Sequence, residues 1–473
     1  MTTVSPPSPE GGVEPVEHGR TERSQYRREV SLKLSVLENK GRVGMNTNWN
    51  GTGVGYRKTV LEDGIKVITE KIPYLNSVSI GVWVITGSRD EQPAENGVSH
   101  FIEHLLFKGT EKRTAYQIAK EIDSVGGSLN AFTGREYTCF YAKVIDTNLP
   151  LAIDLLADIF LHPLFDPKDV EKERMVILQE IKMVEDTPDD YVHDLFNRVC
   201  WGEHPLGYPI LGTAEHVQSF SRDQIHRYFK QNYQPNRIVV CAAGSVDHQE
   251  VVDRIGETFG RIPKADTSRE RVKPQPISTM NISKRDLEQV HFCLGTRGLQ
   301  YNHSLRFASY VLNTILGGGM SSRLFQEIRE NRGLAYSVYS YLPTYADAGL
   351  MVVYAGTGED TFHEVINLTL KEFKSLKNEP FRNGELETTK EQLKGNLLLG
   401  LESSDNMMTR LAKNEIYFES YLPVDQVLEG IAGVSDEEIR RLAGELFDER
   451  FFCLTVLGSL DGKDLGQDLL KLD

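Results

Sequence analysis

The order of predicted strands and helices in the first half of this chain recurs in the second half. In the first half, SVSIGVWVITG alternates as a strand does, GVSHFIEHLLFKG has the spacing of an amphipathic helix, and FYAKVID again predicts a strand. In the second half, VHFCLGTRG, FASYVLNTILGGG and MVVYAGT follow in the same order. Because the copies lie about 210 residues apart, the repeat indicates two duplicated domains and not a solenoid, whose units span about 20 to 50 residues.

Composition and pattern together suggest where these domains begin and end. Residues 1–54 are rich in Pro, Glu, Gly, Ser and Arg, which is typical of a disordered leader. We expect a first domain over 55–262, a polar, proline-containing linker over 263–279, and a second domain over 280–473. Met45 precedes the first regular pattern, so a translation start there is a hypothesis, which N-terminal sequencing of the native protein would reject by finding earlier residues.

Both halves mix strands with long helices and contain strand pairs that are typical of hairpins. We therefore expect an α+β fold in which each domain is a mainly antiparallel sheet packed with helices. With 473 residues, of which 40% are hydrophobic, the chain can bury at least two substantial cores.

Charge and cysteine usage exclude several classes of partner. The formal charge of -15 argues against nucleic acid, because phosphate binding needs clustered Lys and Arg. The five cysteines are widely spaced in mostly apolar stretches and form no Cys-x-x-Cys pair, so we expect buried thiols in a reducing compartment. No window approaches 18 consecutive apolar residues and the first 30 residues lack a secretory apolar core, so we expect no membrane association and a cytoplasmic location.

The helix GVSHFIEHLLFKG carries a pattern with a chemical meaning. Its apolar residues recur at helical spacing and define one buried stripe, whereas His100, Glu103 and His104 project from the opposite side. Imidazoles at i and i+4 lie one turn apart and can share a tetrahedral ion, and the carboxylate between them can reach a water bound to that ion. This H-x-x-E-H pattern is the inverse of the commoner zinc-protease helix, but a third ligand is required.

A second helix, in FDPKDVEKERMVILQEIKMVEDTP, offers candidates for that ligand. Asp166 is placed to cap it and Pro167 to begin it, and Glu173 and Glu180 share one face two turns apart. On its own, so charged a helix is more often a solvated surface. Beside the histidine motif, Glu180 becomes the favoured third ligand.

At this point the chain resembles a known family. The stretches HFIEHLLFKGT and GGSLNAFTGREYT, together with the position of Glu180, are similar to the pitrilysin/insulinase family of inverzincins, in its short bacterial and mitochondrial-processing-peptidase-like branch. The likeness extends from about Tyr56 to Leu460. It implies a zinc metalloendopeptidase in which each of the two domains encloses half of a peptidase chamber.

The resemblance also implies roles for individual residues. One Zn2+ per chain would be held by His100, His104 and Glu180, with Glu173 as a supporting carboxylate. Two imidazoles and one carboxylate leave a fourth position for water, and we expect Glu103 to activate that water as general base.

The second half lacks this metal motif. Ser309, Leu312 and Asn313 stand where the first copy has its two histidines and its glutamate, so the second copy cannot bind zinc in the same way. It carries instead Arg332 and Tyr336, which match an arginine and tyrosine pair of the family. The resemblance implies that Tyr336 donates to the oxyanion and that Arg332 grips substrate oxygens.

The pattern of GGSLNAFTGREYTCFYAKV on its own supports only a turn and a core strand. In the family, the segment corresponding to Asn130, Ala131, Phe132 and Thr133 is an exposed strand edge along which an extended peptide pairs. The resemblance thus implies peptide substrates that are unfolded or presequence-like.

Because both the zinc motif and the Arg/Tyr motif occur in one chain, we expect a homodimer, with a heterodimer with a related subunit as the alternative. The motifs leave open whether Arg332 and Tyr336 act in their own chain or across the dimer. Two other functions also remain: a non-catalytic helper subunit of the same fold, and a zinc hydrolase acting on something other than peptides.

Overall fold

The structure is a computed structural model that describes residues 55–260, 262, 271–460 and 467–472. The leader predicted over 1–54 lies outside the described residues, as do residues 263–270 of the linker predicted over 263–279. No helix in the described ranges is both long and apolar enough to cross a membrane.

The first half is built on a six-stranded sheet. Its strands are β1 (Tyr56–Val60), β2 (Lys66–Lys71), β3 (Ser77–Val84), β4 (Ser128–Thr133), β5 (Thr138–Ile145) and β6 (Ile238–Gly244). They lie in the order β1-β2-β6-β3-β5-β4, and only the β2–β6 pair is parallel. β4 is therefore an edge strand.

The second half is built on a five-stranded sheet with the same order of connection. Its strands are β7 (Thr279–Lys284), β8 (Val290–Arg297), β9 (Ala335–Tyr341), β10 (Leu350–Thr357) and β11 (Cys453–Gly458). The order β7-β11-β8-β10-β9, with only β7–β11 parallel, repeats β2-β6-β3-β5-β4 strand for strand. The prediction of an α+β fold with two similar, mainly antiparallel halves is confirmed, and β9 is the counterpart of the edge strand β4.

Helices follow and cover these strands. In the first half they are α2 (Val98–Leu106), α3 (Ala115–Ser124), α4 (Leu149–Leu161), α5 (Pro167–Glu185), α6 (Pro188–Trp201), α7 (Ala214–Ser219), α8 (Arg222–Asn232) and α9 (His248–Phe259). In the second half they are α10 (Arg306–Gly317), the π-helical segment η6 (Phe325–Glu330), α11 (Phe362–Asn378), α12 (Glu385–Gly400), α13 (Ser404–Phe418), α14 (Val424–Ala432) and α15 (Asp436–Leu446).

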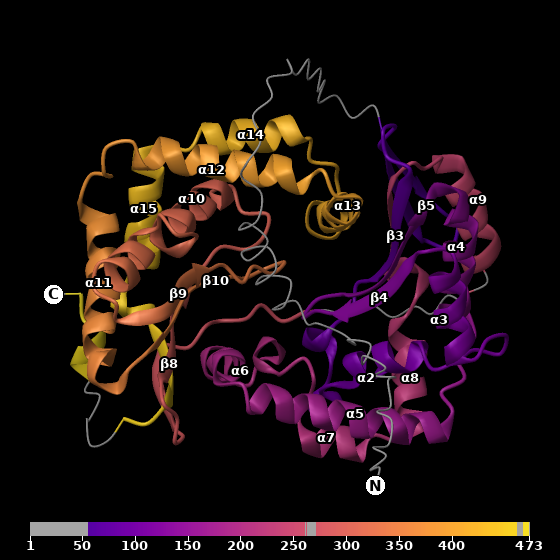
Figure 1. Cartoon of the computed structure of the whole chain (residues 1–473), viewed down its shortest axis with the longest axis horizontal. Coiled ribbons are helices and arrows are strands. Elements are labelled where there is room, and N and C mark those ends of the chain that lie inside the picture. The colour runs from indigo at the N-terminus through magenta and orange to yellow at the C-terminus, as the bar shows by residue number, and fades with distance from the viewer. Residues whose placement is uncertain (1–54, 261, 263–270, 461–466, 473) are drawn as a thin grey trace, which may run out of the picture.

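The two halves exchange one helix each. α13 of the second half packs on β3 and β6 of the first sheet, and α6 of the first half packs on β8 and β11 of the second (Figure 1). Part of the contact of α13 is apolar, because its buried Leu411 and Met408 belong to one cluster with Trp83 and Cys241 of the first sheet. Burying a leucine side chain in this way stabilises a fold by roughly 1.5–3 kcal/mol, so the exchange helps hold the halves together.

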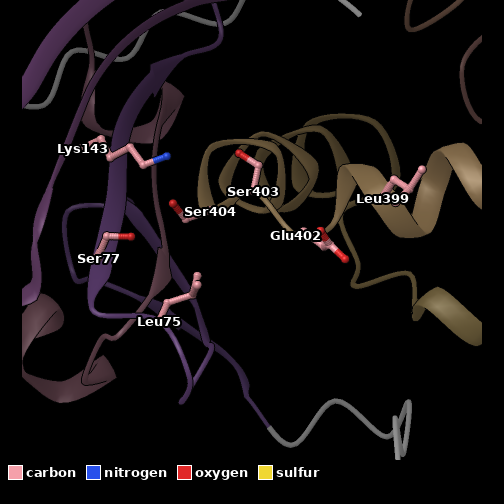
Figure 2. A pocket seen from close by; sticks show the side chains of 7 residues that line it. All are labelled: Leu75, Ser77, Lys143, Leu399, Glu402, Ser403 and Ser404. Carbon is pink, nitrogen blue, oxygen red and sulfur yellow. The ribbon is translucent and has the colours of Figure 1, made fainter. Parts of the chain in front are cut away.

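A cavity of about 400 Å³ lies where the turn between α12 and α13 meets the first sheet. Figure 2 shows its lining from the two halves: Leu75, Ser77, Lys143, Leu399, Glu402, Ser403 and Ser404. At its rim Lys143 Nζ donates to Asp405 Oδ2 at 2.8 Å. None of the residues predicted to bind metal or substrate lines it, so the candidate site is elsewhere.

Candidate metal centre

The helix α2 begins at a crowded turn that only glycine fits. Gly97, its N-cap, has φ +98°, and a Cβ atom there would lie 2.7 Å from the Cα of Gly212. The buried Glu91 carboxylate accepts hydrogen bonds of 2.8 Å from the backbone N–H groups of Gly97 and Ser99. These bonds satisfy the first free donors of α2 and fix the start of the helix that carries the histidines.

The predicted ligands converge between α2 and α5. His100 Nε2 lies 3.7 Å from Glu180 Oε2, and His104 Nε2 lies 3.6 Å from the same oxygen. The three ligand atoms fall within 4.8 Å of one another. Zinc–ligand distances of about 2.0–2.2 Å in a tetrahedral site place ligand atoms about 3.3–3.6 Å apart, so these residues fit the ion with little movement.

His104 is oriented by the carboxylate of Glu173, which Lys108 contacts in turn. Its Nδ1 donates to Glu173 Oε2 at 3.0 Å, and Lys108 Nζ lies 3.0 Å from the other oxygen of Glu173. Burial lowers the pKa of His104, but the carboxylates of Glu173 and Glu180 outweigh burial and raise that pKa to about 9. Because Nδ1 is committed to Glu173, Nε2 is the nitrogen left to bind a metal.

His100 and Glu103 are both buried, and burial shifts their pKa values in opposite directions. Burial, followed by the charge of His104, lowers the pKa of His100 to about 3, so its imidazole is neutral and able to bind metal at neutral pH. Burial raises the pKa of Glu103 to about 7, against the hydrogen bond from Thr133 and the charge of His104. A carboxyl with a pKa near the working pH is suited to accept and return a proton.

The predicted substrate strand is the edge strand β4. Among the described strands β4 pairs with β5, and its other edge faces no strand of the sheet. Asn130 is exposed, whereas Ala131, Phe132 and Thr133 are buried. Thr133 Oγ1 donates to Glu103 Oε2 at 2.5 Å, so this strand contacts the candidate base directly.

Arg332 and Tyr336 do not contact this centre. Arg332 Nη2 donates to Glu327 Oε1 at 2.8 Å, and the guanidinium of Arg329 lies 4.9 Å from the centre of the Tyr336 ring. Figure 1 shows β9, which carries Tyr336, in the second half and apart from α2. The structure thus brings five predicted residues together and leaves these two in the other half.

Tyr336 has a specific backbone position. Gly356 pairs with Ser337 while Thr357 pairs with Ala335, so Tyr336 is the extra residue of a β-bulge on the edge strand β9. Its side chain is 78% exposed. Bulges commonly re-aim a side chain beside a functional site, and here the bulge directs Tyr336 into solvent.

The second half has no equivalent metal centre among the described residues. Ser309, Leu312 and Asn313 lie on α10, and no other group of three His, Cys, Asp or Glu in the described ranges is close enough to hold an ion. Ser309 and Leu312 are buried, so these positions serve packing.

Two contacts were not anticipated from the sequence. Lys108 lies just beyond the C-terminal end of α2, four residues after His104, and its pairing with Glu173 was not predicted. The bond from Thr133 to Glu103 joins residues of a strand and a helix, and no local pattern predicts it.

The comparisons with known proteins agree with this geometry. Residues 66–214 match the model of "Insulinase (Peptidase family M16)", and residues 219–393 match "Peptidase M16 inactive domain". A protein of Bacillus subtilis named "Uncharacterized zinc protease YmxG" is 42% identical over 84% of this chain and 96% of its own length. An uncharacterized zinc protease of Streptomyces coelicolor is 43% identical over 87% of this chain and 91% of its own.

Solved structures share the fold at lower identity. A protease from Helicobacter pylori superposes with a TM-score of 0.79 at 21% identity, over 85% of this chain and 99% of its own. A peptidase M16 inactive domain from Pseudomonas fluorescens gives a TM-score of 0.81 at 18% identity, over 87% of this chain and 100% of its own.

Proposed function

Because this chain belongs to the insulinase family, peptidase family M16, we propose that it is a zinc-dependent endopeptidase that hydrolyses unfolded peptides or presequence-like segments in a closed chamber. One observation carries the proposal: His100, His104 and Glu180 present their ligand atoms to one point, beside the buried carboxyl of Glu103. The zinc proteases named among the relatives support the choice of metal and reaction.

Zinc, when bound, supplies a Lewis acid that polarises a peptide carbonyl and lowers the pKa of a coordinated water. Glu103 accepts the proton of the attacking water and returns it to the leaving amine. Thr133 holds one oxygen of Glu103 in place, and Glu173 holds the ring of His104 in the tautomer that binds metal.

The peptide itself is proposed to lie along the free edge of β4. Main-chain hydrogen bonds to the segment 130–133 would select an extended conformation with weak dependence on sequence. Arg332 and Tyr336 would reach the substrate from the second half, either of the same chain or of a partner. Their exposed side chains are compatible with that role.

The test is Glu103→Gln, compared with Glu171→Gln as a control on the exposed face of α5. Glu103→Gln should keep about one zinc per chain and lose about 10²–10⁴ in turnover, because only the base is removed. Metal analysis and peptide-library digestion followed by mass spectrometry measure the two properties. If Glu103→Gln cleaves normally, the proposed mechanism is wrong. If the zinc-loaded wild type cleaves nothing, the helper-subunit alternative is favoured.

We further propose that the chain acts as a homodimer, and a heterodimer with a related subunit is the alternative. The argument remains the presence of both motifs in one chain. Mass measurement of the active species decides, because a fully active monomer contradicts the proposal.

A further inference from the structure

Glu136 lies in the turn between β4 and β5 and is almost fully buried. Its Oε1 accepts hydrogen bonds from Arg89 at 2.7 Å and from Arg271 at 3.2 Å. Its Oε2 accepts from the backbone N–H of Ala346 at 3.0 Å and from the hydroxyl of Tyr417 at 3.1 Å. Ala346 follows β9 and Tyr417 lies on α13, so one carboxylate joins the β4–β5 turn to two segments of the second half.

The two arginines that bind Glu136 also form ion pairs with other carboxylates. Arg89 binds Asp347 of the second half with two hydrogen bonds of 2.7 Å, one to each oxygen. Arg271 binds Asp90 in the same forked manner, at 2.9 and 2.8 Å. Two arginines and three carboxylates thus meet where the two halves touch. We call Arg89, Asp90, Glu136, Arg271 and Asp347 the junction cluster.

Glu136 of the junction cluster is only three positions along the chain from Thr133, which contacts the candidate base Glu103. The turn after β4 is closed by the Gly134 N–H, which donates to the Tyr137 carbonyl at 2.8 Å. Thr133, the last residue of β4, is therefore placed by the turn that Glu136 anchors, and Thr133 donates to Glu103. A shift of the turn moves the hydroxyl that holds the base.

Stability alone does not explain why this contact is ionic. A buried ion pair repays its desolvation only with good geometry, and apolar residues of similar volume commonly serve as well. Forked Arg–carboxylate bonds also fix an orientation, because the two parallel N–H···O bonds hold the guanidinium and the carboxylate in one plane. The forked bonds between Arg89 and Asp347 therefore fix the orientation of the two halves at this contact.

We propose that Glu136 is a positioning residue, which transmits the placement of the second half through the β4–β5 turn to Thr133 and so to Glu103. The inference rests on the proposed function, since it assigns Glu103 the role of base. It implies that Glu103 is correctly placed beside the candidate metal ligands only when the second half contacts the first through the junction cluster.

Glu136→Gln tests this with a change of few atoms. An amide has one oxygen, so it can accept from the two arginines or from Ala346 and Tyr417, but not from both pairs. We expect kcat to fall by about 10–100-fold with zinc content unchanged, since small misplacements of catalytic groups cost this much. Glu372→Gln is the matched control, because Glu372 is a buried carboxylate 3.5 Å from Arg323 in the second half. It should leave kcat unaffected.

A double-mutant cycle with Thr133→Val separates positioning from general damage. If Glu136 acts through Thr133, Glu136→Gln should lower kcat little in a chain that already carries Thr133→Val. The losses in kcat from the two substitutions should then be clearly less than additive. Fully additive losses would overturn the proposal. Should Glu136→Gln fold poorly, Tyr417→Phe removes a single donor and should shift kcat in the same direction by a smaller factor.

Hydrogen exchange gives a readout that does not depend on activity. In the zinc-loaded full chain, Glu136→Gln should speed exchange of the amides in 133–138 and of Ala346 by about tenfold or more, while α9 and α11 stay unchanged. Unchanged exchange in 133–138 would contradict the proposal. If the wild type cleaves no peptide, the proposed function fails, yet this measurement still decides whether Glu136 holds the turn.

Discussion

His104 donates from Nδ1 to Glu173 Oε2 at 3.0 Å, and that bond determines which nitrogen faces Glu180. The two residues come from different helices, α2 and α5. Lys108 approaches the other oxygen of the same carboxylate and balances its charge. The arrangement would orient His104, a proposed metal ligand, through a neighbouring carboxylate, as metal sites commonly do.

Glu173→Gln should weaken zinc binding by about 10–100-fold, because the amide is a poorer acceptor and leaves Lys108 without its partner charge. Competition with a chromophoric chelator measures the affinity. Glu171→Gln, on the exposed side of the same helix, serves as control and should bind zinc as the wild type does. Equal affinities for the two variants would show that Glu173 does not support the site.

Zinc binding should release a proton in a pH-dependent way. The pKa of His104 is raised to about 9 in the metal-free chain, so near pH 7 its ring carries a proton that zinc must displace. We expect release of about one proton from this group near pH 7 and almost none above pH 10. Calorimetry in buffers of different ionisation enthalpy counts the protons, and Glu173→Gln should shift the transition to lower pH.

The same pKa affects the stability of the metal-free chain. A raised folded pKa means that the contribution of His104 is fully present below its unfolded pKa of about 6.5 and is lost as the pH rises through about 9. Thermal unfolding in the presence of a chelator, compared between wild type and His104→Gln from pH 6 to 10, isolates this contribution. A difference in Tm that stays constant over this range would contradict the assignment.

Tyr336→Phe should lower kcat by about 10²–10³-fold, the usual cost of removing one donor to an oxyanion. Zinc content should be unchanged, because Tyr336 lies on β9 and does not contact the metal ligands. Tyr116→Phe is the control, since Tyr116 is similarly exposed, at 73%, on a helix of the first half. Equal turnover by the two variants would remove Tyr336 from the proposed mechanism.

Leu411→Ala should destabilise the chain by about 2–5 kcal/mol, because the buried side chain fills the contact between α13 and the first sheet. Denaturant unfolding measures the loss. Leu398→Ala on α12, where the side chain is 46% exposed, should cost far less. Similar costs for both would mean that the helix exchange contributes little to holding the halves together.

Several parts of the molecule could be predicted from local pattern. The spacing of Val98, Phe101, Ile102 and Leu105 predicts α2 and the face from which its histidines project, because helical periodicity depends only on neighbours along the chain. The cap at Asp166 and the seven-residue spacing of Glu173 and Glu180 likewise predict α5 and its shared face. The repeat of strands and helices predicts two similar halves.

The tertiary structure decided the contacts between segments that are far apart in sequence. The meeting of α2 with α5, the hydrogen bond from Thr133 to Glu103, the exchange of α6 and α13, and the junction cluster around Glu136 all depend on the path of the chain through space. The bulge at Tyr336 depends on pairing with β10. The sequence by itself thus determined which side chains share a face, since periodicity is local, while only packing between distant elements decided which faces meet.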